Sequence, residues 1–167
     1  MLDPHGSLLA LHVAAGALGL ILGPVAIWAS MHGQLEGDAH SAYHWSVLAV
    51  CLTASGLVAL DLAGLWWLLL LAVLSYALAL LGFLAPRRRW RGWVGAYARG
   101  QGGSYIALVT ASLVVSVEGT AAVAAWVLPT LVGHPLVERR VAWLEVREHT
   151  ERPPAPGYPT PVMRDRA

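Results

Sequence analysis

Long apolar segments separated by short polar ones make up most of this chain. The first runs from about Leu8 to Ser30, and a polar segment over 31–42 separates it from a second, Tyr43–Leu60. A third runs from Leu65 to Ala85 and precedes Pro86, which we expect to end it because proline disfavours a helix. About 20 apolar residues span the hydrocarbon core as a helix. The pattern therefore predicts three membrane-spanning helices in the first half of the chain.

The next apolar stretch, residues 104–137, is too long for one span. A helix of about 34 residues would measure about 51 Å, against a hydrocarbon core of about 30 Å. Glu118 and Gly119 lie near the middle of the stretch, so we expect two helices, over about 103–117 and 120–137, joined by a tight hairpin. Prolines 129 and 135 should kink the second of these helices or unwind its end. The predicted fold class is therefore all-α, a polytopic transmembrane bundle of about five helices.

The chain continues past its last apolar segment in two parts of different composition. Residues 138–151 are charged but compatible with a helix, and Val141, Leu144 and Val146 form a short apolar stripe that we expect at the membrane surface. Residues 153–167 open with five prolines in nine positions. We therefore divide the chain into a transmembrane bundle with a short cytoplasmic amphipathic extension, residues 1–152, and a proline-rich disordered tail, residues 153–167.

Composition and charge point to a membrane location. Hydrophobic residues make up 57% of the chain and charged residues 13%, whereas soluble domains average about 25% charged residues. The 11 basic residues are all arginine, and most lie either in the segment 87–91 or after residue 137. The positive-inside rule places both groups in the cytoplasm. We therefore expect five spans in a bacterial inner membrane, with the N-terminus outside, the C-terminus inside, and lipid rather than nucleic acid as the partner of the arginines.

Histidines are the most informative polar residues. His32, His40 and His44 lie within 13 positions, and the expected topology brings His134 to the same cytoplasmic level. Imidazole is a good ligand for zinc, iron and nickel, so these four residues are the candidate metal ligands. A b-type haem needs two histidines at one depth on facing helices, and His44 with His134 meets this condition. The other interpretation is that each side chain simply meets water and headgroups at the interface.

A second candidate site lies at the outer end of the bundle. His12 shares a face of the first apolar segment with Ala15, Gly19 and Gly23, a small-residue stripe that should face a neighbouring helix. Glu118 lies at the same outer level in the expected topology. Because ionisable residues inside a membrane are usually paired, we expect His12 and Glu118 to form a buried polar pair. Such a pair either transfers a proton or only holds two helices together.

The motifs of soluble enzymes are absent from the sequence. There is no CxxC and no HExxH, and the glycine-rich run Gly100–Gly103 lacks the lysine of a phosphate-binding loop. The pattern also gives no arrangement of Ser, His and Asp as a triad. The sequence therefore offers no catalytic residue, and a non-enzymatic role is favoured.

Four runs carry a family resemblance: Leu11–Gly16, Leu22–Pro24, Arg99–Ala111 and Trp126–Pro135. Through them, over about residues 8–137, the chain resembles a bacterial family of predicted polytopic membrane proteins of unknown function. The resemblance implies an all-helical membrane fold without an established activity. Members of that family often carry a histidine in the loop before the glycine-rich run, where this chain has Ala96-Tyr97-Ala98.

The leading interpretation is a structural or accessory helix-bundle subunit of the membrane. Its partners would be the lipid bilayer and other membrane subunits or a second copy of the chain. Two alternatives stay open. One is a redox protein that binds a metal ion or haem through its histidines, and the other is a small proton-linked transporter that uses His12 and Glu118.

Overall fold

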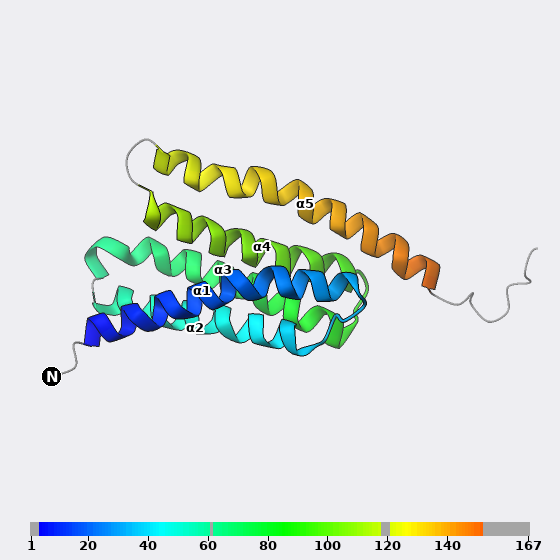
Figure 1. Cartoon of the computed structure of the whole chain (residues 1–167), viewed down its shortest axis with the longest axis horizontal. Helices are drawn as coiled ribbons and strands as arrows, with labels where there is room; N and C mark the ends of the chain where they lie inside the picture. The colour runs from blue at the N-terminus through cyan, green and yellow to red at the C-terminus, as the bar shows by residue number, and fades with distance from the viewer. Residues whose placement is uncertain (1–3, 61, 118–120, 152–167) are drawn as a thin grey trace, which may run out of the picture.

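The computed structural model describes residues 4–60, 62–117 and 121–151, and every long element among them is a helix (Figure 1). The helices, in chain order, are α1 (Pro4–Met31), α2 (Asp38–Leu60), α3 (Leu62–Arg88), α4 (Trp93–Ser116) and α5 (Ala121–Glu151). The predicted all-α bundle of five helices is confirmed.

Helix α4 has the most neighbours in the bundle. It packs against α3 on one side and α5 on another, and it also contacts α1. Helix α2 packs against α1 and α3, whereas α5 packs along α4 at the edge of the bundle (Figure 1). Consecutive helices run in opposite directions, so the loops α1–α2 and α3–α4 and the end of α5 lie together at one end of the molecule.

Three helices are long and apolar enough to cross a membrane. Judged by length and composition, they are His5–Met31, Asp38–Leu60 and Leu68–Arg88. Large apolar side chains are exposed along these helices, as expected where the solvent is lipid. The finding supports the predicted membrane location at the level of these three helices.

Several helix ends differ from the prediction. Pro86 does not end α3, which continues to Arg88. Helix α4 begins at Trp93, about ten residues before the predicted start, and so contains the whole glycine-rich run. Helix α5 continues past Pro129 and Pro135 to Glu151. Sequence propensity penalises both glycine and proline within helices, and in this bundle helix packing outweighs that penalty.

The amphipathic segment after residue 137 is a continuation of α5. Val141 and Leu144 are 3% and 6% exposed, and they pack in a small core with Ala85, Val94 and Tyr97. Val146, the third residue of the predicted stripe, is exposed. Two of the three stripe residues therefore pack on protein, at the charged end of the bundle, and not on the membrane surface as predicted.

The predicted small-residue stripe of α1 does face a neighbouring helix. Gly19 lies against Leu108 of α4, and Gly23 lies against the ring of Tyr105 on the same helix. The Tyr105 hydroxyl donates a hydrogen bond of 3.3 Å to the carbonyl of Leu20. In a regular helix that carbonyl would accept from the N–H of residue 24, but residue 24 is proline and has none. Tyr105 therefore satisfies a backbone acceptor that Pro24 leaves unpaired.

Glycines allow α3 and α4 to touch through their backbones. A β-carbon at Gly100 would meet the backbone nitrogen of Gly82 and would lie 2.7 Å from the carbonyl oxygen of Leu78. A β-carbon at Gly82 would lie 2.7 Å from the backbone nitrogen of Gln101. On α5, Gly133 leaves space for the side chain of Ile106 from α4. Any side chain at the α3–α4 crossing would force these two helices apart.

This contact makes a sharp prediction for Gly100→Ala. Alanine raises intrinsic helix propensity by about 1 kcal/mol over glycine, but the added methyl group overlaps backbone atoms that cannot rotate away. Overpacking of this kind costs about 1–3 kcal/mol or more, so we expect a lower midpoint of thermal unfolding in detergent.

The matched control is Gly16→Ala, because a β-carbon at Gly16 meets nothing within 4 Å. That variant should be as stable as the wild type or more stable. Equal stability of the two variants would contradict the backbone contact between α3 and α4.

Candidate functional site

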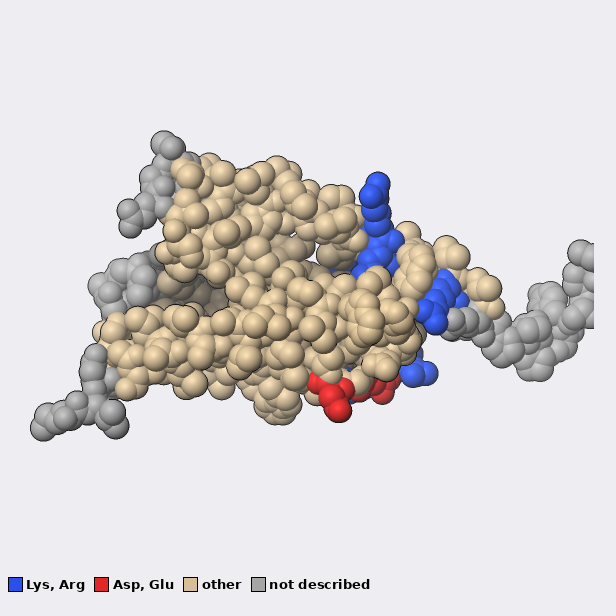
Figure 2. Space-filling view, in the orientation of Figure 1, with Lys and Arg blue, Asp and Glu red and all other residues tan. Residues whose placement is uncertain are grey.

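The charged side chains of the described residues lie at one end of the bundle. They come from the α1–α2 loop and the start of α2, from the end of α3 through the first turns of α4, and from α5 after residue 137. Figure 2 shows this gathering on one face of the molecule, with the rest of the described surface in that view free of charge. The two clusters of arginines that the sequence analysis assigned to one side of the membrane are therefore close in space.

A buried hydrogen-bond network crosses the interior just inside this end. Its members are Ser30, His40, Tyr97 and Arg140, from four different helices, and we call them the inner polar network. His40 Nε2 lies 2.5 Å from the Tyr97 hydroxyl. Arg140 Nη2 donates to that hydroxyl at 3.4 Å and also to Ser30 Oγ. Ser30 Oγ in turn donates to the carbonyl of Ile27 at 2.7 Å.

The direction of the bond between His40 and Tyr97 depends on the tautomer of His40. Arginine has only donors, so the Tyr97 hydroxyl accepts from Arg140 and can direct its own hydrogen to His40 Nε2. The ring proton of neutral His40 then lies on Nδ1. A tyrosine phenol has an ordinary pKa of about 10, so the Tyr97 hydroxyl keeps its proton at neutral pH. The network is therefore a chain of neutral groups ending on one buried guanidinium.

Further polar contacts fix α5 against α4 and α1. Arg99 makes two hydrogen bonds of 2.9 Å to the carboxylate of Glu138, and these bonds lower the pKa of that exposed carboxyl group. Arg147 donates to the carbonyl of Met31 at 3.3 Å. With Arg140 at Ser30, two arginines of α5 thus lie at the C-terminal end of α1, where the helix dipole favours positive charge.

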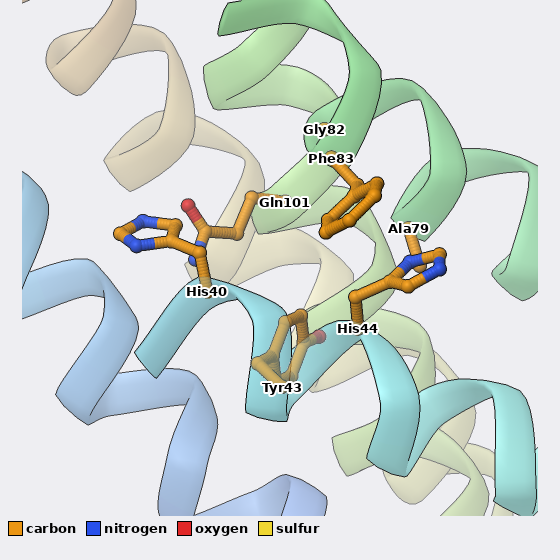
Figure 3. Close-up of a pocket in the computed structure, with 7 residues that line it drawn as sticks. All are labelled: His40, Tyr43, His44, Ala79, Gly82, Phe83 and Gln101. Carbon is orange, nitrogen blue, oxygen red and sulfur yellow. The ribbon is translucent and has the colours of Figure 1, made fainter. Parts of the chain in front are cut away.

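A small cavity lies next to the inner polar network, between α2, α3 and α4. Its volume is about 10 Å³, which is about the space that one water molecule needs. Figure 3 shows the residues that line it, namely His40, Tyr43, His44, Ala79, Gly82, Phe83 and Gln101. Gln101 reaches the cavity because the neighbouring Gly100 brings α4 onto α3.

The spacing of His40 and His44 places both on the buried face of α2, but their rings point in different directions (Figure 3). His40 turns to Tyr97 of α4. His44 turns to α3 and stacks on Phe83, with ring centroids 4.1 Å apart and an interplanar angle of 16°. Both residues are 5% exposed. The prediction that they share one metal is not supported, because each ring has a separate aromatic partner.

The other predicted metal ligands lie elsewhere. His32 is exposed at the end of α1, where its ring lies against Trp28 at a tilt of 44° and bonds to the Trp28 carbonyl at 3.0 Å. His134 is exposed on α5, and α4 separates that helix from α2, so His134 does not face His44 as the haem prediction required. In the described ranges, no three His, Cys, Asp or Glu side chains come together in a way that could hold a metal ion.

The predicted pair of His12 and Glu118 is only half visible. Glu118 lies outside the described residues. His12 points inward, as expected, but toward α2: its Nδ1 lies 3.0 Å from Thr53 Oγ1 and 3.2 Å from the carbonyl of Val50. The contact gives His12 a neutral polar partner on α2.

Sequence reasoning missed the residues that link the helices at the charged end. Tyr97 and Gln101 were passed over as parts of a loop and of a glycine-rich run, and Arg140 as part of a surface segment. One signal was available: Gln101 is a polar residue between glycines that permit close packing. Tyr97 and Arg140 carry no comparable signal, because their burial depends on the early start of α4 and the docking of α5.

The network predicts a clear effect for Tyr97→Phe. The substitution keeps the ring but leaves His40 Nε2 buried without its partner, and an unpaired buried polar group costs about 1–3 kcal/mol. We expect a lower midpoint of thermal unfolding. Tyr76→Phe is the control, because its ring also packs beside a histidine and no hydrogen bond of its hydroxyl is seen among the described residues. If both variants have the same midpoint of thermal unfolding as the wild type, Tyr97 does not join the helices in this way.

Comparison with known proteins adds no identification. No family model, no curated protein and no solved structure matches the chain. The resemblance to a bacterial family of membrane proteins therefore stays a prediction.

Proposed function

We propose that this chain is a five-span protein of the bacterial inner membrane that acts as a structural or accessory subunit. The observation that carries the proposal is the exposure of large apolar side chains on all five helices, where a water-soluble bundle would be polar. One example from each helix, in chain order, is Ile21, Leu52, Leu70, Val115 and Leu131.

Helices α4 and α5 belong to the spanning set in this proposal. They are less apolar than the first three because Arg99, Gln101 and four glycines interrupt α4, and because α5 contains His134 and the charged residues after 137. However, the part of each helix away from the charged end is apolar and exposed, as at Val115 and Val123. If the α4–α5 hairpin stayed outside the membrane, these side chains would face water beside a bundle that is itself in lipid.

A packing role fits the described geometry better than redox chemistry does. The histidines proposed as metal and haem ligands lie on different faces, and α2 and α5 do not pack against each other in the described ranges. Glycines instead bring helices close together in several places, and large apolar side chains stay exposed on the outside. Such a bundle is suited to bind further helices through its outer surface, either of another subunit or of a second copy.

The orientation of the protein follows from the shared position of its arginines. With the charged end inside, the N-terminus is outside and the C-terminus is cytoplasmic. Reporter fusions after Arg91 and at Ala167 should both read cytoplasmic, and a fusion after Gly119 should read external. A cytoplasmic signal at Gly119 would show that α4 and α5 do not cross, and would leave a three-span protein.

The subunit role is tested by the size of the protein in mild detergent. The chain has a mass of 17.8 kDa. If it serves as a subunit, protein expressed at its native level should elute from size-exclusion chromatography in a particle of larger, defined protein mass. Light scattering, with the detergent contribution subtracted, measures that mass. Elution as a single chain, at all detergent concentrations that keep it folded, would contradict an accessory role.

A further inference from the structure

Three residues that line the cavity beside the inner polar network carry unpaired polar atoms. Four buried atoms of these residues have no hydrogen-bond partner among the described residues: His40 Nδ1, His44 Nδ1, and both Nε2 and Oε1 of Gln101. Gln101 is 4% exposed. A buried amide that lost water without gaining a partner would be destabilising, and native proteins rarely leave such groups unpaired. These atoms therefore call for a bound molecule.

Their arrangement in space shows which of them one molecule can reach. In Figure 3 the carboxamide of Gln101 lies beside His40, above the ring of Tyr43. His44 lies on the far side of Phe83, against which it stacks. His40 and Gln101 are therefore the pair that a single bound molecule would join.

Size and charge limit what that molecule can be. The cavity of about 10 Å³ holds about one water molecule, and a bound water needs two to four polar partners. A cation is disfavoured because two guanidinium groups are near: Arg87 lies over the ring of Phe83 at 3.6 Å, and Arg140 bonds to Tyr97. Most anions and organic ligands are too large for this space.

We propose that the cavity binds one water molecule, which bridges His40 Nδ1 and the carboxamide of Gln101. In this arrangement Tyr97 donates to His40 Nε2, and the ring proton lies on Nδ1 and donates to the water oxygen. The water then donates to Gln101 Oε1, and Gln101 Nε2 can donate back to the water. Three of the four unpaired atoms gain partners in this way.

The water would extend the inner polar network deeper into the bundle. The connected groups would run from Arg140 of α5 through Tyr97 of α4 and His40 of α2 to Gln101 of α4. At Gln101 a second set begins: the carbonyl of that residue accepts from Ser104 Oγ at 2.9 Å, and Ser104 accepts from the Tyr43 hydroxyl at 2.9 Å. The site would thus connect the charged end to polar side chains within the apolar part of the bundle.

Substitution distinguishes a hydrated site from a dry one. If water is bound, Gln101→Met leaves His40 Nδ1 without a partner and lowers the midpoint of thermal unfolding by about 2–4 °C, the shift that corresponds to one lost hydrogen bond in a chain of this size. If the cavity is dry, the same variant removes an unpaired amide and raises the midpoint or leaves it unchanged. Gln34→Met, at an exposed position in the α1–α2 loop, is the matched control.

The double variant tests whether His40 and Gln101 share the molecule. His40→Leu and Gln101→Met should together cost less than the sum of the two single losses, because either change removes the bridge. Simple additivity would overturn a shared water.

A measurement on the wild-type protein keeps the proposal testable if the variants do not fold. In water-edited solid-state NMR of the protein in lipid bilayers, magnetisation should pass from water to the Gln101 amide and to the His40 ring as readily as to exposed Gln34. Transfer to Gln34 without transfer to Gln101 or His40 would show a dry cavity and overturn the proposal.

Discussion

The contact between the backbones of α3 and α4 at Gly82 and Gly100 is the constraint on which the rest of this structure depends. It fixes α4 against α3 closely enough to turn Gln101 into the interior, opposite α2. One turn earlier on α4, the same placement brings Tyr97 within 2.5 Å of His40. On another face, Gly102 leaves space for Val137 of α5. Side chains at these glycines would separate α4 from both neighbours, and neither the network nor the cavity would form.

Where helix packing leaves a polar group unpaired, a side chain from another helix supplies the partner. Tyr105 of α4 bonds to the carbonyl that Pro24 leaves free in α1. At the C-terminal end of α1, Arg147 of α5 donates to the backbone carbonyl of Met31, and Arg140 donates to the side-chain hydroxyl of Ser30. In a hydrocarbon environment the free carbonyl of Leu20 would be costly without such a partner. The polar contacts therefore help to determine how the helices are arranged, whereas apolar packing holds the bundle together.

The sequence predicted the number of helices and one packing face because the length of an apolar segment and the spacing of small residues can be read from neighbouring positions in the chain. Five helices, the inward face of α1 and the shared end of the arginines all follow from such patterns. The prediction failed at the helix ends, because glycines in α4 and prolines in α3 and α5 lower helix propensity and only tertiary packing restores it. It also did not foresee where the rings of His40 and His44 point. Their spacing fixes the face of α2 on which they lie, but Tyr97 and Phe83, from other helices, decide where each ring points.

The distance between the two glycines at the crossing most directly tests whether this contact organises the bundle. Protein labelled with carbon-13 only at glycine Cα, in lipid bilayers, should show a through-space correlation between Gly82 and Gly100, since these residues are far apart in sequence and in contact in the fold. Sequential Gly102–Gly103 provides the internal reference for a short distance. A correlation as strong as that reference is the predicted result. If the reference appears and the Gly82–Gly100 signal is absent, α3 and α4 do not touch at this point, and the polar network cannot depend on their contact.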